Sequence, residues 1–169
     1  MEPSELLEQW HTGLRIKHDA HTRAAVIFET RSRLLGVPVV IVSTAVGTSI
    51  FAGAGSSPTL KIIAGLLSFG AAVLSSLQAA LKYPEIAAQH KAAAQKYGQL
   101  RREIEVQLAV KPEEQKLTHV LDKFQQAWDT LDDQSPTIPQ RIYDKSAKII
   151  TSGSQPQRSP SVTAKTGGS

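Results

Sequence analysis

The sequence contains no cysteine, a single methionine and few aromatic residues, which make up 5% of the chain. Without cysteine there is no disulfide framework, no thiol nucleophile and no thiolate metal site. Enzyme motifs are missing as well: the chain has no glycine-rich phosphate loop, no His-Glu-x-x-His and no Gly-x-Ser-x-Gly. We therefore expect a protein that is not an enzyme and that needs no cofactor.

Charged residues are absent from two long stretches in the middle of the chain. None occurs from Leu34 to Leu60, and none occurs from Ile62 to Leu81. Because a bilayer core needs about 20 helical residues, we predict transmembrane helices at residues 34–53 and 62–81, joined by a tight turn. The alternative is a soluble helical bundle that buries this hairpin, but two consecutive uncharged runs of this length are rare in soluble domains.

The segments on either side of the hairpin are polar and have apolar residues at alternating spacings of three and four. This spacing predicts amphipathic helices at residues 5–33 and 85–110, which a tight hairpin would bring together as an antiparallel pair. Further helices are predicted at residues 113–133 and 138–150. Residues 151–169 have almost nothing to bury and are predicted to be disordered. The expected fold is all-α, with one domain over residues 1–150.

Basic residues lie close to the hairpin on both flanks. They are Arg15, Lys17, Arg23, Arg31 and Arg33 before it, and Lys82, Lys91, Lys96, Arg101 and Arg102 after it. The connecting turn has only Lys61 at its edge, so the positive-inside rule predicts a multi-pass membrane protein with both termini in the cytoplasm. The net charge of +4 suits an anionic membrane or a nucleotide and is too small for a dedicated nucleic-acid binder.

Small and hydroxyl-bearing residues are frequent in both predicted membrane helices. The candidates for packing between subunits or for lining a pore are Ser43, Thr44, Gly47, Thr48, Gly65, Ser68, Ala72, Ser75 and Ser76. Helices in lipid associate through such residues, and two helices cannot enclose a conduit, so these positions favour a homo-oligomer. Alternatively, the hydroxyls simply bond to the backbone of their own helices.

Polar residues interrupt the apolar stripes of the two flanking helices. Lys17 and His21 do so in the first and His90 in the second, so the three form a possible cytoplasmic ligand seam, or else a solvated gap. His11, His18 and His21 are the only candidate metal ligands, and no further ligand accompanies them, so we predict no metal site. Asp132 and Asp133 lie in a helix-ending stretch and are expected to be solvated caps.

Two segments carry a resemblance to a known family. They are YPEIAAQHKAAAQKYGQLRREIE, directly after the second apolar run, and the later SPTIPQ. With the hairpin before them, they make roughly residues 5 to 150 similar to the SLATT family, the two-transmembrane effector domains associated with bacterial nucleotide-signalling and defence systems. Neither segment is a catalytic motif.

The resemblance implies a non-enzymatic effector of antiviral defence. Such an effector would oligomerise in the bacterial inner (cell) membrane and form a pore, or otherwise disrupt the membrane, when a nucleotide second messenger or a partner signalling protein activates it. The leak would kill or arrest an infected cell, an outcome called abortive infection. The alternative is a membrane-anchored scaffold or regulator that recruits a cytoplasmic partner without conducting ions.

Overall fold

The computed structural model describes residues 3–51, 57–110 and 114–153, and within these ranges it contains five helices and no strand. The helices are α1 (Pro3–Phe51), α2 (Pro58–Leu81), α3 (Tyr83–Val110), α4 (Glu114–Gln134) and α5 (Gln140–Gly153). The prediction of an all-α fold is therefore confirmed. The predicted segments 5–33 and 34–53 form one uninterrupted helix as far as Phe51, with Pro38 inside it.

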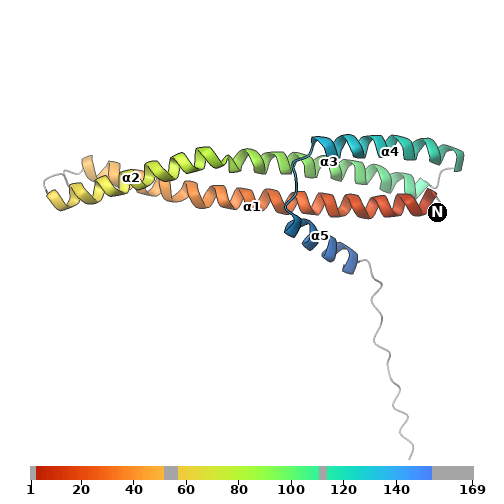
Figure 1. The fold of residues 1–169 in the computed structure, drawn as a ribbon, viewed down its shortest axis with the longest axis horizontal. Coiled ribbons are helices and arrows are strands. Elements are labelled where there is room, and N and C mark those ends of the chain that lie inside the picture. The colour runs from red at the N-terminus through yellow and green to blue at the C-terminus, as the bar shows by residue number, and fades with distance from the viewer. Residues whose placement is uncertain (1–2, 52–56, 111–113, 154–169) are drawn as a thin grey trace, which may run out of the picture.

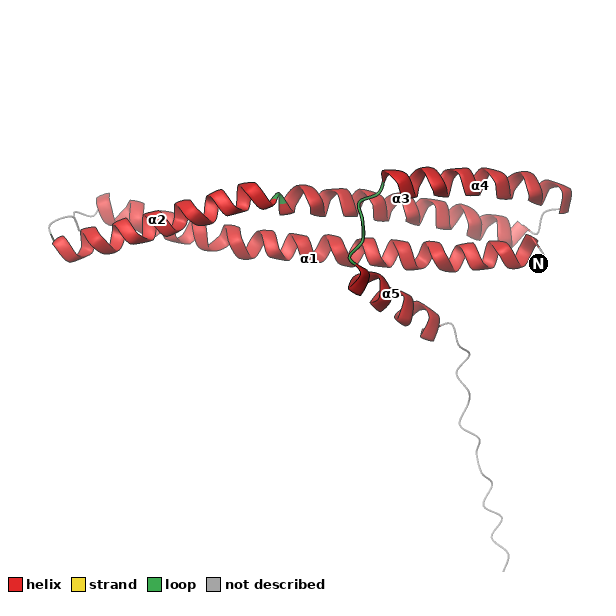
Figure 2. Cartoon of the chain, viewed as in Figure 1, coloured by secondary structure: helices red, strands yellow, loops and turns green. Residues whose placement is uncertain are grey.

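The molecule is a long rod in which α1 runs antiparallel to the succession of α2 and α3 (Figure 1). Lys82 separates α2 from α3: it adopts a left-handed backbone with φ of 48°, and α3 begins at the next residue. Pro84 accounts for this interruption, because it has no amide hydrogen to donate to the carbonyl four residues earlier and its ring clashes with that carbonyl, so α2 cannot continue through it. The junction is short enough for α3 to continue beside α1 (Figure 2).

The helices α4 and α5 cover only the half of the rod that contains the N-terminus (Figure 1). The core there is built from α1, α3 and α4 and consists of Leu7, Leu14, Ala93, Tyr97, Leu100, Ile104, Phe124 and Leu131. An extended segment at residues 136–139 crosses from α4 to α5, which packs on α1. This arrangement leaves the other half of the rod, the hairpin of α1 and α2, without a covering helix.

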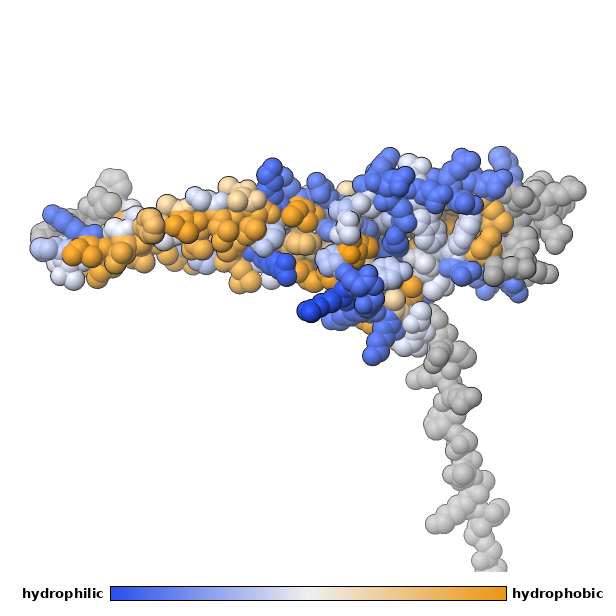
Figure 3. All heavy atoms as spheres, viewed as in Figure 1, coloured by the Kyte–Doolittle hydropathy of each residue, from blue (hydrophilic) through white to orange (hydrophobic). Residues whose placement is uncertain are grey.

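The uncovered hairpin exposes large apolar side chains. Val40 is 66% exposed and Phe69 is 71% exposed, whereas Ala71 is the one residue of α2 that is buried. Figure 3 shows apolar residues gathered over this half and hydrophilic residues over the other half. Within the described ranges, the helical stretch Pro58–Val110 contains a segment that is long and apolar enough to cross a membrane, and 6% of that segment is buried.

Two predicted boundaries near the C-terminus are wrong. Helix α5 begins at Gln140 instead of residue 138, because Pro139 holds Ile138 extended and the Pro139 carbonyl accepts the Ile142 amide at 2.9 Å. The same helix continues through Thr151 to Gly153, so the predicted tail begins too early. The rest of that tail, residues 154–169, and the predicted helical residue 113 lie outside the described residues.

Candidate functional site

A polar cluster joins α1, α3 and α4 at the hairpin-facing end of the core. Lys17 of α1 donates hydrogen bonds to both carboxylate oxygens of Asp132 at 3.1 Å, and the Tyr97 hydroxyl of α3 donates to the same carboxylate. The Lys17 ammonium also lies 5.9 Å from the centre of the Tyr97 ring. Asp132 is exposed, as expected of a solvated residue, but its carboxylate binds groups from two other helices.

Next to this cluster, two buried histidines from opposite helices meet. The Nδ1 atoms of His21 and His90 lie 2.9 Å apart, and both residues are 1% exposed. At this distance one imidazole donates a hydrogen bond and the other accepts it, which requires that they are not both protonated. His21 stacks on Tyr97 and His90 stacks on Phe28, with ring centres 5.2 and 5.5 Å apart.

The environment keeps both imidazoles neutral near pH 7. Burial, the neighbouring His90 and then the Lys17 charge lower the pKa of His21 to about 4, while burial also lowers the pKa of His90. Burial and the hydrogen bond to Asp132 raise the pKa of Tyr97, which therefore stays a neutral phenol. The cluster thus has one cation, Lys17, and the Asp132 carboxylate already compensates it.

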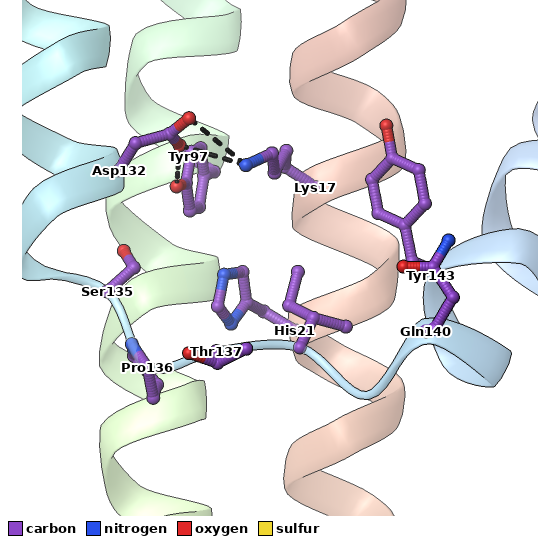
Figure 4. A pocket seen from close by; sticks show the side chains of 10 residues that line it. Lys17, His21, Tyr97, Asp132, Ser135, Pro136, Thr137, Gln140 and Tyr143 are labelled. Atoms are coloured by element: carbon purple, nitrogen blue, oxygen red, sulfur yellow. Dashed lines mark hydrogen bonds and ion pairs between the residues drawn. The ribbon is translucent and has the colours of Figure 1, made fainter.

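A cavity of about 320 Å³ opens on this cluster, and the extended segment after α4 forms one of its walls (Figure 4). Its lining residues are Lys17, His21, Tyr97, Asp132, Ser135, Pro136, Thr137, Ile138, Gln140 and Tyr143. The SPTIPQ segment thus contributes five of its residues, Ser135 to Ile138 and Gln140, beside two members of the predicted seam. The volume suits a small ligand, but a single compensated lysine offers little attraction to several phosphate charges.

Sequence reasoning found part of this cavity and missed the rest. It brought Lys17, His21 and His90 together, and the structure places His90 against His21 but not in the cavity wall. Tyr97 lies on the apolar stripe of the second flanking helix and Asp132 was predicted to be a cap, so the sequence did not predict the hydrogen bond between them. The position of Tyr97 on this stripe could have predicted the bond, because a tyrosine hydroxyl that is buried with an apolar helix face needs a polar partner.

The three histidines considered for a metal site have separate partners. His11 Nε2 lies 2.8 Å from a Glu105 carboxylate oxygen, and His18 Nδ1 lies 2.8 Å from the Ala94 carbonyl oxygen, while His21 bonds to His90. Among the residues that the structure describes, no three His, Cys, Asp or Glu side chains gather in a way that could hold a metal ion.

The predicted packing residues of the hairpin, apart from Gly65, fall into two groups. One group faces a hollow of about 360 Å³ between the helices, which is lined by Val42, Ser43, Val46, Gly47, Ser68, Ala71, Ala72 and Ser75. In the other group, Thr44, Thr48 and Ser76 donate hydrogen bonds to carbonyls one turn earlier in their own helices. A side chain added at Gly65 would meet nothing within 4 Å, so the packing of α1 on α2 does not use it.

Comparison with protein-family models, with curated proteins and with solved structures finds no match for this chain.

Proposed function

We propose that this chain is a membrane effector whose hairpin of α1 and α2 crosses the bacterial inner membrane twice, with both termini in the cytoplasm. Copies of the hairpin assemble, and the assembly forms a pore or disrupts the membrane without any enzymatic step. The consequence for the cell is death or growth arrest, as the resemblance to the SLATT family implies.

The exposure of the hairpin carries this proposal. In a soluble protein, large apolar side chains in a continuous band of this size would attract other chains nonspecifically. Lipid removes that cost, because burying apolar surface away from water is favourable by about 25 cal/mol for each Å². The charge-free part of α1, from Leu34 to Phe51, lies beside α2, so the two helices fit the same bilayer together.

The hollow between α1 and α2 supports assembly over simple anchoring. Its small side chains, among them Ser43, Gly47 and Ser75, leave room that the chain itself does not fill. In lipid, close approach of small residues is a main source of helix association. A second copy that packs against these faces would gain contacts that a lone hairpin does not make.

The hydroxyl bonds favour the second candidate, a membrane-anchored scaffold. Thr44, Thr48 and Ser76 already donate to their own helices, and such groups add little to a conducting path. In that case the hairpin only tethers, and the cytoplasmic helices recruit a partner.

Substitutions in the hairpin distinguish the two candidates. Ser43→Leu with Ser75→Leu fills the hollow, whereas Thr44→Val with Ser76→Ala removes hydroxyls that bond only to their own helices. When the protein is expressed at increasing levels in a bacterium, a membrane-potential dye should report depolarisation for the parent and the control pair and little for the leucine pair. A fully polarised membrane that contains abundant parent protein would overturn the effector proposal and favour the scaffold. Depolarisation by the leucine pair as strong as that by the control pair would show that assembly does not use the hollow.

A further inference from the structure

Both tryptophans of the chain meet at one surface hollow, far from the membrane hairpin. Trp10 of α1 and Trp128 of α4 lie edge to face, with ring centres 6.3 Å apart and planes at 70°. Together with Gln125 and Asp129 they line a hollow of about 280 Å³. The fit of Trp128 against α1 depends on Gly13, where an added Cβ would lie 2.6 Å from the indole ring.

The chemistry of this hollow suits a guanidinium group. Two indole rings line it, and indole is the most favourable aromatic partner for a cation. The exposed Asp129 supplies a carboxylate, and it makes no ion pair within the part of the chain that the structure describes. An arginine fits better than a lysine, because its planar group can stack on a ring and bond to a carboxylate at once.

The same chain carries two exposed arginines on another face of the bundle. Arg15 of α1 and Arg102 of α3 make no ion pair among the described residues. His11 contacts Glu105, and His18 lies 3.1 Å from the position of a Cβ added at Gly98, so residues 11–18 of α1 face residues 98–105 of α3. Arg15 and Arg102 therefore lie on either side of the line where these two helices meet. We call these two residues the basic ridge.

The basic ridge and the tryptophan hollow lie at the same level along the rod. Asp132 bonds to Lys17. Asp129 is about 4.5 Å farther from the hairpin than Asp132, and Arg15 is about 3 Å farther than Lys17, at 1.5 Å of helix rise per residue. Copies inserted in one membrane share this level, because the hairpin fixes the height of each copy.

The two surfaces point in different directions. Arg15 is two residues from Lys17, which contacts α4, and a helix turns about 100° for each residue, so Arg15 points about 160° away from Lys17. A hollow on one side and a ridge on the other cannot pair symmetrically in a dimer. They can pair head to tail, which closes into a ring when the rotation allows it.

We propose that the hollow lined by Trp10, Gln125, Trp128 and Asp129 binds an arginine of the basic ridge of a second copy of this chain. This contact rests on the proposed function, since it requires assembly in the membrane, and it specifies how the cytoplasmic bundles join. The pairing is heterologous, so the basic ridge of each copy binds the hollow of one neighbour, and its hollow binds the basic ridge of the other neighbour.

The natural lack of cysteine permits a clean cross-linking test in the full chain. A variant with Asp129→Cys and one with Arg102→Cys are expressed in the same membrane and treated with a short bismaleimide. A cross-linked pair should form only when both variants are present, and the double variant should give a ladder of higher species. Asp122→Cys, about 10 Å farther along α4, is the control and should cross-link much less.

Charge exchange supplies the second measurement. Asp129→Arg should reduce the oligomeric fraction of the detergent-solubilised protein about tenfold, and Arg15→Asp with Arg102→Asp should restore it in the same chain. The control Asp133→Arg changes the same charge outside the hollow and should leave assembly unchanged.

Oligomers that persist with Asp129→Arg and give no cross-link would overturn this contact and leave the proposed function standing. A parent protein that is monomeric at every concentration would overturn both, and capture of an unrelated basic protein in place of a second copy would overturn the contact alone.

Discussion

The buried imidazole pair makes the stability of the cytoplasmic bundle sensitive to acid. Burial lowers the pKa of His21 from 6.5 to about 4, so the folded state resists a proton that the unfolded chain accepts. The stability contributed by neutral His21 is therefore fully present above pH 6.5 and is lost as the pH falls toward 4. For this group the loss approaches about 3 kcal/mol.

Thermal unfolding between pH 7 and pH 4.5 measures this effect. The parent should lose stability steeply over that range, and His21→Asn with His90→Asn should flatten the dependence, since amides can keep a hydrogen bond but do not titrate there. An equally steep curve for the double variant would assign the acid sensitivity to other groups.

A single glycine decides whether α4 can approach α1. In an open helix Gly→Ala stabilises by about 1 kcal/mol, but at Gly13 the new Cβ would meet the Trp128 ring at 2.6 Å. We expect Gly13→Ala to lower the free energy of unfolding by about 1–3 kcal/mol. Gly70→Ala is the control, because nothing lies within 4 Å of its added Cβ. Chemical denaturation of the two variants should separate them, and equal stability would contradict the close contact.

At the scale of elements, the hydrogen bonds that Lys17 of α1 and Tyr97 of α3 donate to Asp132 connect α4 to these two helices. Lys17 and Asp132 are partly exposed, so we expect a coupling energy of only about 0.5–1 kcal/mol in a double-mutant cycle with Lys17→Met and Asp132→Asn. Hydrogen exchange in α4 should accelerate in each single variant. The control Asp133→Asn should not change it, and unchanged protection in Asp132→Asn would show that apolar packing alone holds α4.

Helix positions follow from sequence more closely than helix contacts do. The alternating spacing of apolar residues locates α3, and uncharged length locates α2, because both signals depend on residues close in the chain. The link between α4 and α5 was harder to place, since Ile138 is apolar and matches a helical stripe. Its extended backbone depends on Pro139, whose ring acts on the residue before it.

For the whole molecule, the proposed topology places Ser57 on the outer side and both Glu8 and Glu103 in the cytoplasm. Cysteine introduced singly at each position can be labelled with a membrane-impermeant maleimide, without background because the chain has no cysteine. In intact spheroplasts we expect labelling of Ser57→Cys alone. Labelling of Glu8→Cys as well would mean that α1 does not cross the membrane and that α2 crosses it alone.

By itself, the sequence determined the all-α composition, the uncharged stretches and the polar flanks, because these depend on which residues are neighbours along the chain. It also brought Lys17, His21 and His90 to one seam through helical periodicity. Only the tertiary structure decided that Asp132 returns from α4 to bind Lys17, and that Trp10 and Trp128 share one hollow. Those contacts join residues more than a hundred positions apart, and their geometry depends on how three helices rotate against one another, which local spacing does not encode.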